Sequence, residues 1–335
     1  MCMNCQIYLF LKKTTITVLF FISGVFVSQS SASEFDEVYR FLQIPSTPHA
    51  AGLGGNMVSL PETDANAFMI NPAYLNETQH RLVGLSYLNY ITDINTGVAS
   101  GIYDIRDYGT FGFGIKYMDY GDFTRTDADG QEHGSFRSYD VAITTGWGYA
   151  ITDDLQGGIS LHSVLSSYDT YSSSAVAVSG GLLYTINDQT HAGVTVNHLG
   201  RQITNFDQQT EPLPLDVRAG ISRRLTHLPL RLSVTFHSLH QWDMPIHQDD
   251  EDPGFTSNFF RRVNVGGEFL FTENVQLRIG YNHLKHEELK ADSRIDLAGA
   301  GIGLGINVNR FRFDFSRTNY SDVGALTQLS VQMRL

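Results

Sequence analysis

An alternation of apolar and polar residues recurs from residue 81 to residue 335 and constrains the fold of this chain more than any other feature. In residues 230–236, for example, leucine, valine and phenylalanine stand at every second position, with arginine, serine and threonine between them. Successive side chains of a β-strand point to opposite faces, so each such segment predicts a strand with one apolar and one polar face. The pattern therefore predicts an all-β structure over residues 81–335.

We expect about fourteen antiparallel strands, an even number like that of bacterial single-chain barrels. Their expected starts lie near Arg81, Asn95, Gly109, Phe136, Leu155, Ala175, His191, Leu215, Leu230, Arg261, Val275, Asp296, Phe311 and Ala325. Short connections such as 152–154 and 272–274 alternate with long polar ones such as 200–214 and 241–260. This asymmetry is typical of a transmembrane barrel with short periplasmic turns and long external loops, so both termini are expected to face the periplasm.

A soluble β-sandwich is the alternative fold, because it buries the apolar strand faces between two sheets. The number and length of the strands, the strict alternation of turns, and the Gly, Ser, Thr, Asn and Arg on the polar faces favour the barrel instead. The net charge of −12, with Lys and Arg interspersed, argues against a nucleic-acid surface, which needs a concentrated basic patch.

The first 32 residues have the composition of a secretory signal. Two lysines precede an apolar run at 16–27, and small residues follow it. About twelve apolar residues are too few for a membrane-spanning helix, which needs roughly 20. Cleavage after residues 1–32 removes Cys2 and Cys5, so no disulfide, thiolate or cysteine metal site is expected in the mature protein. The expected destination is the outer membrane.

Residues 33–80 break the alternation and contain prolines and a glycine cluster. A stretch of about 45 irregular residues is long for a linker inside a compact domain. We therefore expect this segment to pack into the lumen as a plug, with residues 81–335 forming the barrel.

Four pieces of the plug segment carry a family resemblance: FLQIP at 41–45, HAAGLGGN at 49–56, DANAF at 64–68 and NPAYL at 71–75. In this order they resemble the start of the PorV/PorQ family of type IX secretion proteins, and the opening is more similar to the PorQ branch. More distantly they resemble the FadL-type transporters, whose plug carries a similar Asn-Pro-Ala. Members of both families are fourteen-stranded barrels.

The resemblance implies a non-enzymatic outer-membrane component of the type IX secretion and surface-attachment machinery, holding a PorZ-like partner protein at the surface. The alternative that it leaves open is a FadL-type transporter of small hydrophobic compounds. An apolar pocket in the lumen favours transport, whereas a sealed lumen favours scaffolding. The plug motif expected from the resemblance comprises Gly52, Gly54, Gly55, Asn56, Asn71, Pro72 and Ala73.

Charged residues of the last six strands point into the lumen if the apolar faces point to lipid. They are Arg231, Glu268, Arg278, Arg312, Asp314 and Arg334. We hypothesise that this cluster holds the plug by salt bridges, because charges in the lumen cost little compared with charges facing lipid. The alternative is a solvated network that does not touch the plug.

Aromatic residues in the two longest predicted external loops are candidates for partner contacts, since interface cores are enriched in aromatic side chains. They are Phe206, Trp242, Phe255, Phe259 and Phe260. A membrane-interface girdle is an equally good explanation. Outer-membrane lipid and lipopolysaccharide are the other expected partners.

Other motifs indicate structure rather than chemistry. The glycines at every second position of 299–305 share one strand face, which fits close approach of the plug and not a dinucleotide loop. The pairs His237/His240 and His283/His286 point to opposite faces if they lie on strands, so no metal site is expected. Acidic stretches at 127–130 and 249–252 lack calcium-loop spacing. No ordered nucleophile motif is present, and neither an enzyme nor a cofactor is expected.

Overall fold

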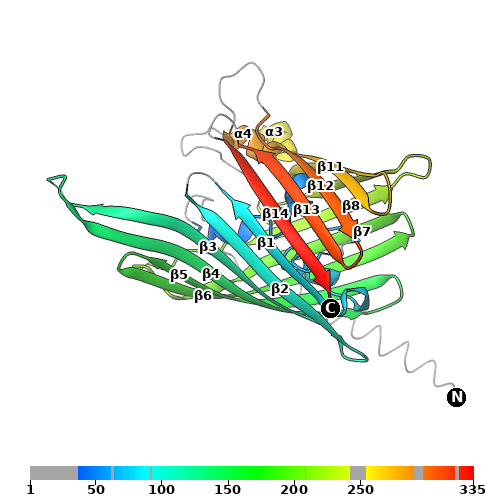
Figure 1. Ribbon diagram of the computed structural model, residues 1–335, viewed down its shortest axis with the longest axis horizontal. Coiled ribbons are helices and arrows are strands. Elements are labelled where there is room, and N and C mark those ends of the chain that lie inside the picture. Colours follow the sequence, from blue (N-terminus) through cyan, green and yellow to red (C-terminus); the bar gives the residue numbers. More distant parts are fainter. Residues whose placement is uncertain are drawn as a thin grey trace. The chain divides into compact units, whose positions relative to one another are not determined.

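The computed structural model describes residues 37–61, 64–90, 93–127, 129–207, 209–241, 254–289, 297–320 and 324–335. These residues form a closed antiparallel barrel of fourteen strands, which confirms the predicted fold class (Figure 1). The strands are β1 Leu82–Asn89, β2 Asn95–Ile105, β3 Gly109–Thr126, β4 Glu132–Ala150, β5 Leu155–Tyr168, β6 Tyr171–Asn187, β7 Thr190–Thr204, β8 Asp216–Arg224, β9 Leu230–Phe236, β10 Val263–Leu270, β11 Val275–Asn282, β12 Ala300–Val308, β13 Phe311–Asn319 and β14 Ala325–Arg334. Each strand pairs with the next, and β14 pairs with β1 to close the barrel.

Most strand starts fall at or near the predicted positions, but two helices were not predicted. The helix α3 (Gly254–Arg261) ends just before β10, which begins at Val263, close to the start expected near Arg261. A second helix, α4 (His283–Leu289), follows β11 directly. Residues 290–296, including the expected start near Asp296, lie outside the described ranges, as do the predicted signal and both cysteines.

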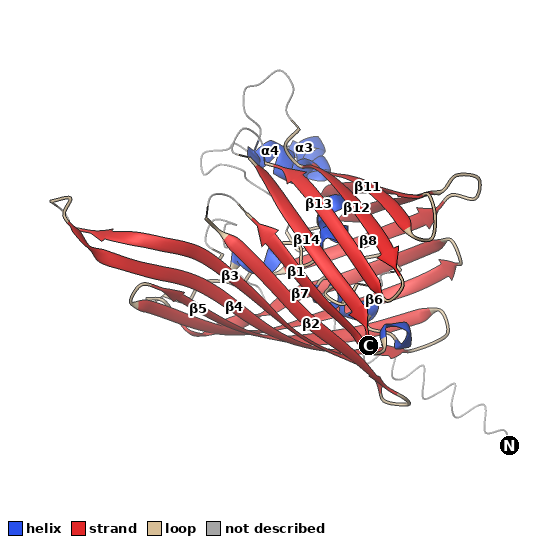
Figure 2. Ribbon diagram, viewed as in Figure 1, coloured by secondary structure: helices blue, strands red, loops and turns tan. Residues whose placement is uncertain are grey.

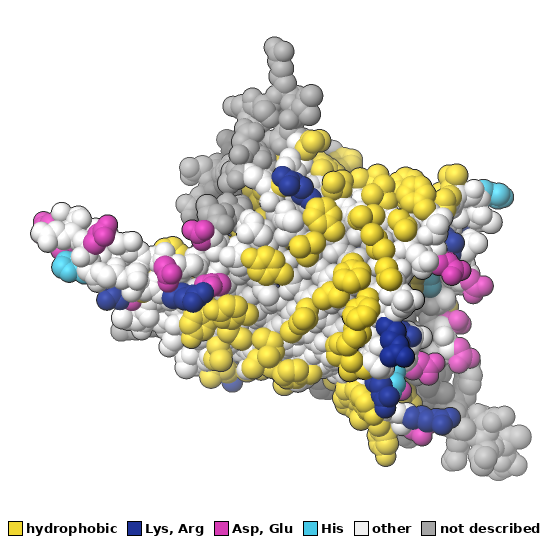
Figure 3. Space-filling view, viewed as in Figure 1, with side chains coloured by type: hydrophobic (Ala, Val, Ile, Leu, Met, Phe, Trp, Pro, Cys, Tyr) yellow, Lys and Arg dark blue, Asp and Glu magenta, His cyan; other side chains and the backbone are white. Residues whose placement is uncertain are grey.

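The alternation sorts the side chains as a membrane barrel requires. Leu85 is 59% exposed and Leu329 is 52% exposed on the outer wall, whereas inward residues such as Ser86 and Ser330 are buried. Apolar side chains cover much of the visible outer surface (Figure 3). Soluble proteins rarely expose apolar patches of this extent, so the structure excludes the sandwich alternative.

None of the described helices is long and apolar enough to cross a membrane.

Strands β3 and β4 extend far beyond their neighbours (Figure 1). Pairing between β2 and β3 ends at Asn95 and Asp119, so the rest of β3 pairs with β4 alone. Phe123 and Phe136 stack across this ribbon, with ring centroids 5.4 Å apart.

The described residues 37–61 and 64–80 lie inside the barrel, and we call them the N-terminal segment. Its short helices are η2 Arg40–Gln43, α2 Pro48–Gly52, η3 Ala67–Met69, η4 Pro72–Tyr74 and η5 Glu77–Gln79 (Figure 2). The side chains of Thr47, Asn71 and Asn76 cap three of these helices by accepting backbone N–H groups. Prolines stand at the first position of α2 and η4. The lack of an N–H group costs nothing there, because an N–H at this position has no acceptor within the helix.

Candidate functional site

Inward-facing glycines provide the space that the N-terminal segment occupies. They come from strands around the barrel: Gly84, Gly112, Gly146, Gly148, Gly158, Gly181, Gly193, Gly266, Gly280, Gly301 and Gly303. We call this set the glycine track. A Cβ atom on Gly193 would lie 1.9 Å from the Val58 carbonyl oxygen, and one on Gly280 would lie 2.0 Å from the Leu53 carbonyl carbon. The backbone of the segment approaches the wall at distances that only glycine allows.

The glycine run near β12 follows this pattern only in part. Gly301 and Gly303 face Ala51 and Gly52 of the segment. Gly305 instead leaves space for the Arg278 guanidinium, since a Cβ there would lie 2.6 Å from its Nη2. Gly299 precedes the strand and has φ +76°, so the prediction that all four share one strand face was wrong for this residue.

Polar side chains of the wall also bond the segment at several points. Gln156 donates to the Leu75 carbonyl at 2.8 Å, and Ser222 donates to the Ser59 carbonyl at 2.6 Å. On the opposite side of the barrel, Gln332 accepts the Ala65 N–H at 3.1 Å. The segment is thus attached to strands on more than one side of the lumen.

The Asn-Pro-Ala motif joins two parts of the segment. The Asn71 Nδ2 donates to the Val58 carbonyl at 2.8 Å, while its Oδ1 accepts the Ala73 N–H at 3.0 Å. Pro72 begins η4, and Ala73 is fully buried. A Cβ on Gly181 would lie 2.0 Å from Asn71 Oδ1, so this motif is pressed against β6.

Of the remaining motif residues, Gly52 ends α2, and Gly54, Gly55 and Asn56 lie directly after this helix. Gly54 and Gly55 have φ of +96° and +108°, a region that glycine adopts without strain, and Asn56 after them is half-buried. The Gly54 carbonyl accepts a bond from Asn282 of β11 at 3.3 Å. Gly52 packs against Gly303 of β12.

Five of the six predicted lumen charges form a network across neighbouring strands, and only Arg334 lies outside it. Arg278 donates to Glu268 at 2.9 Å and to Asp314 at 2.6 Å, and Arg231 donates to Glu268 at 2.7 Å. Arg278, Glu268 and Asp314 are almost completely buried. Adjacent strand positions bring them together, because Glu268 is the direct partner of both Arg231 and Arg278 in the barrel register.

The N-terminal segment reaches this network through His49 of α2. The His49 Nε2 lies 3.0 Å from Glu268 Oε1, and its Nδ1 lies 3.3 Å from Arg312 Nη2. Arg312 also donates to Asp314 at 2.8 Å. Because a guanidinium only donates, Nδ1 is the acceptor of the contact with Arg312, and Nε2 lies within ion-pair distance of the Glu268 carboxylate. His49 was not among the predicted site residues, although its position beside Pro48 at a helix start was visible in the sequence.

Arg334 lies apart from the other five charges. It is exposed, and its guanidinium donates to the Thr78 carbonyl at 2.8 Å. It therefore contacts the N-terminal segment at a separate point.

An apolar patch on the inner wall of β3–β6 was not predicted. It is formed by Met118, Ala142, Val164, Ala175 and Ala177. Phe41, which is 2% exposed, and Tyr39 pack against it from the N-terminal segment. The sequence does indicate this patch at 141–143 and 175–178, where apolar residues occupy both faces of the predicted strand.

Lys116 on β3 lies beside this patch and holds the same part of the segment. Its ammonium group donates to the Ile44 carbonyl at 2.5 Å and lies 3.5 Å from the Leu42 carbonyl. Lys116 is 3% exposed.

Replacement of Lys116 by Met is expected to loosen residues 38–44, because a hydrogen bond to a charged group contributes about 1.5–3 kcal/mol. Limited proteolysis of the folded protein should cut this stretch several times faster than in the wild type. Lys285→Met is the matched control, since that half-buried lysine lies over the Tyr320 ring instead. Equal cleavage of the wild type and Lys116→Met would contradict this role.

The predicted external aromatics do not form one surface. Phe255, Phe259 and Phe260 are exposed on α3, and Phe259 contacts Phe236 at the end of β9. Phe206 is half-buried and packs on Tyr39 and Tyr168, so it belongs with the segment contacts. Trp242 lies outside the described ranges.

The histidine pair His283/His286 lies on α4 and not on a strand, so the prediction that it points to opposite faces was wrong. The two rings stack with centroids 6.1 Å apart. Within the ranges that the structure describes, no group of three or more metal-ligating side chains gathers around a common point.

Asp127 in the loop after β3 is held by its own loop. Its carboxylate accepts the N–H groups of Asp129 and Gln131, and its Oδ2 lies 2.6 Å from His133 Nε2. The hydrogen bond from His133, with help from the backbone bonds, lowers the pKa of the Asp127 carboxyl below its usual value. The acidic stretch 249–252 lies outside the described ranges.

A closed barrel with an apolar outer wall, a largely polar inner wall and a strap in its lumen defines a transmembrane β-barrel. Among solved structures it is similar in fold to FadL-like outer-membrane channels. One is the deltaS2S3 mutant of the TodX monoaromatic hydrocarbon channel, with a TM-score of 0.55 and 15% identity over 87% of this chain and 99% of that one. The toluene transporter TodX of Pseudomonas putida has a TM-score of 0.54 and 13% identity over 87% of this chain and 97% of that one.

The CymD monoaromatic hydrocarbon channel is also similar, with a TM-score of 0.52 and 15% identity over 88% of this chain and 98% of that one. No protein-family model and no curated protein sequence matches the chain. At these identities the likeness concerns the fold. None of these findings tests the resemblance to the PorV/PorQ family or a role in type IX secretion, which stay predictions.

Proposed function

We propose that this protein is an outer-membrane channel for small hydrophobic compounds, with the N-terminal segment as its plug. The signal-like N-terminus and the turn asymmetry support a placement with the short turns in the periplasm. The apolar patch on β3–β6 carries the proposal, because an apolar lining favours the passage of hydrophobic compounds and not that of hydrophilic solutes. The names of the fold neighbours TodX and CymD, both hydrocarbon channels, point the same way.

Phe41 occupies the place that a substrate ring would take. Complete burial of such a side chain contributes about 1.5–3 kcal/mol. A small aromatic solute gains a similar free energy from the same patch, so exchange between Phe41 and solute is nearly balanced. A charged solute would lose its hydration on entering, which favours neutral compounds.

The test places an amide in the patch. Val164→Asn is expected to lower uptake of radiolabelled toluene about tenfold, since a buried amide without a partner costs about 1–3 kcal/mol. Ser160→Asn, at an inward and buried position of the same strand, is the matched control and should retain wild-type uptake. The assay uses vesicles that contain the folded full chain.

Phe41→Ala is the second arm and should raise toluene uptake severalfold, because the solute no longer displaces a ring. If Val164→Asn and Ser160→Asn behave alike and Phe41→Ala has no effect, hydrocarbon passage along this patch is wrong. The effect of the variants on barrel folding is checked from the mobility of unheated samples in gels.

A further inference from the structure

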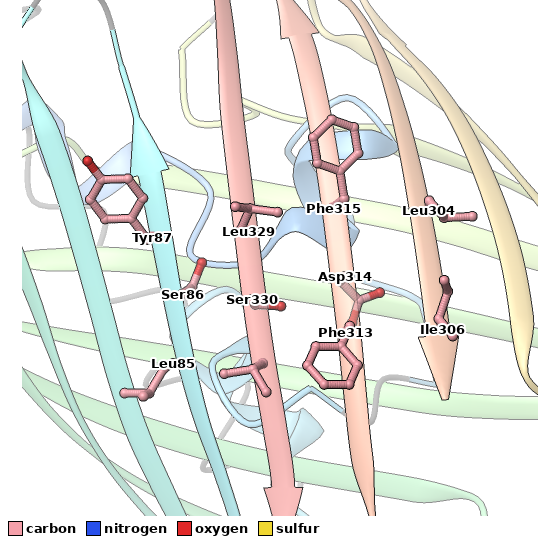
Figure 4. A pocket seen from close by; sticks show the side chains of 11 residues that line it. Leu85, Ser86, Tyr87, Leu304, Ile306, Phe313, Asp314, Phe315, Leu329 and Ser330 are labelled. Atoms are coloured by element: carbon pink, nitrogen blue, oxygen red, sulfur yellow. The ribbon is translucent and has the colours of Figure 1, made fainter. Parts of the chain in front are cut away.

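The outer wall of the barrel carries a trough of about 420 Å³ across β12, β13, β14 and β1 (Figure 4). Its two edges are rows of outward side chains that are partners across the strands. The upper row contains Tyr87, Leu329 and Phe315, and the lower row contains Leu85, Val331 and Phe313.

The floor of the trough is the sheet itself. Ser86, Ser330 and Asp314 are successive partners between the two rows, and all three are buried. Their side chains belong to the lumen face, where Asp314 bonds Arg278 and Arg312. The outer side of this middle row therefore has no side chain of its own, and the surrounding lining is apolar.

Two exposed arginines lie at the short-turn end below the trough. Arg81 directly precedes β1, and Arg310 lies in the turn between β12 and β13. The Arg334 N–H donates to the Arg310 carbonyl at 3.2 Å, and the Leu335 N–H donates to the Arg81 carbonyl at 2.9 Å. The two arginines thus flank the end of β14, where Figure 3 shows basic side chains next to the apolar wall.

Neither arginine is neutralised by its described neighbours. Within the part of the chain that the structure describes, no ion pair involves Arg81 or Arg310. The nearby turn between β2 and β3 carries both Arg106 and Asp107, whose charges offset each other. Guanidinium groups without a carboxylate bind phosphate well, because both N–H edges match its oxygens.

The distance between the two arginines and the trough fits the length of one lipid molecule. The lower row begins three or four residues above the arginines, which is about 10–13 Å at roughly 3.3 Å per residue. Half of a bilayer hydrocarbon core is about 15 Å thick. A phosphate held at the rim therefore places the far half of its acyl chain, the part nearest the bilayer centre, at the trough.

We propose that this wall binds one anionic glycerophospholipid from the leaflet on the short-turn side. Its phosphate contacts Arg81 and Arg310, and one acyl chain lies in the trough between the Tyr87 and Leu85 rows. The site rests on the membrane placement proposed above and does not depend on hydrocarbon passage. The trough is continuous with the lipid-facing wall, which favours lipid over a protein partner.

Native mass spectrometry of the purified full chain, reconstituted with equal phosphatidylglycerol and phosphatidylethanolamine, tests the phosphate contact. We expect one phosphatidylglycerol to stay bound when looser lipid is stripped by collisions. The double variant Arg81→Gln/Arg310→Gln should lower this retained fraction about tenfold. The matched control is Arg223→Gln/Arg224→Gln. These two exposed arginines lie at the end of β8, which is also on the short-turn side of the barrel. Equal retention in both double variants, or equal retention of the two lipids, would overturn the proposal.

A second variant tests the trough. Val331→Trp should block it and lower retention of phosphatidylglycerol, whereas Val265→Trp, also outward and on β10, should not. Retention in Val331→Trp at the wild-type level would place the acyl chain elsewhere and overturn this part of the site. Toluene uptake measured on the same variants separates the two proposals, because the lipid variants leave the inner patch intact.

Discussion

Gly181→Val is expected to displace the N-terminal segment and to raise the ion conductance of the barrel severalfold. A Cβ at this position would lie 2.0 Å from Asn71 Oδ1, 3.1 Å from Asn71 Cγ and 3.2 Å from Pro72 Cδ. The Asn71 side chain cannot move away without losing its hydrogen bonds to Val58 and Ala73, and it is buried. Overpacking of this kind costs about 1–3 kcal/mol, which the segment avoids by leaving the wall.

Gly180→Val supplies the control in the same strand. A Cβ on Gly180 meets no atom within 4 Å, so a side chain there changes the strand but not the lumen. Planar-bilayer recordings should show wild-type conductance for Gly180→Val and a larger conductance for Gly181→Val. Cleavage of residues 37–80 by added protease should rise in Gly181→Val alone. If the conductances of the two variants agree, the glycine track does not keep the segment in place.

Arg278→Met is expected to lower the free energy of unfolding by about 3–5 kcal/mol, the usual effect of breaking a buried ion pair. The change leaves Glu268 and Asp314 buried with fewer partners, since each loses a charged donor at 2.9 Å and 2.6 Å. Urea unfolding of the barrel in lipid vesicles measures the effect. Proteolysis of the N-terminal segment should also become faster, because Glu268 holds His49.

The control for this prediction is Arg223→Met, an exposed position whose replacement should change the unfolding free energy by no more than about 0.5 kcal/mol. A destabilisation below about 1 kcal/mol in Arg278→Met would mean that water or another cation already screens these carboxylates.

The strand pattern was predictable because each strand of a membrane barrel must satisfy a local rule. One face meets lipid and the other meets the lumen, so apolar and polar residues must alternate in every strand. The same rule explains why the helices α3 and α4 were not predicted. Outside the bilayer no alternation is required, and external connections can fold as helices without any change in the period-two signal.

The inward direction of the charges of β9–β13 also followed from alternation, but their partners did not. The sequence places Arg278 and Asp314 on one face of the sheet, while barrel register and the absent side chain of Gly305 bring them within 2.6 Å. His49 is far from both along the chain and joins them only because α2 packs against β12 and β13.

The sequence by itself determined the all-β class, the approximate strand number and the faces of the strands, since these depend on neighbours one or two residues apart. Tertiary structure alone decided the rest. The β3–β6 patch that receives Phe41, the glycine track and the outer trough each combine residues from several strands. Their geometry depends on register and on the path of the N-terminal segment through the lumen, and both are set by contacts between residues remote in the chain.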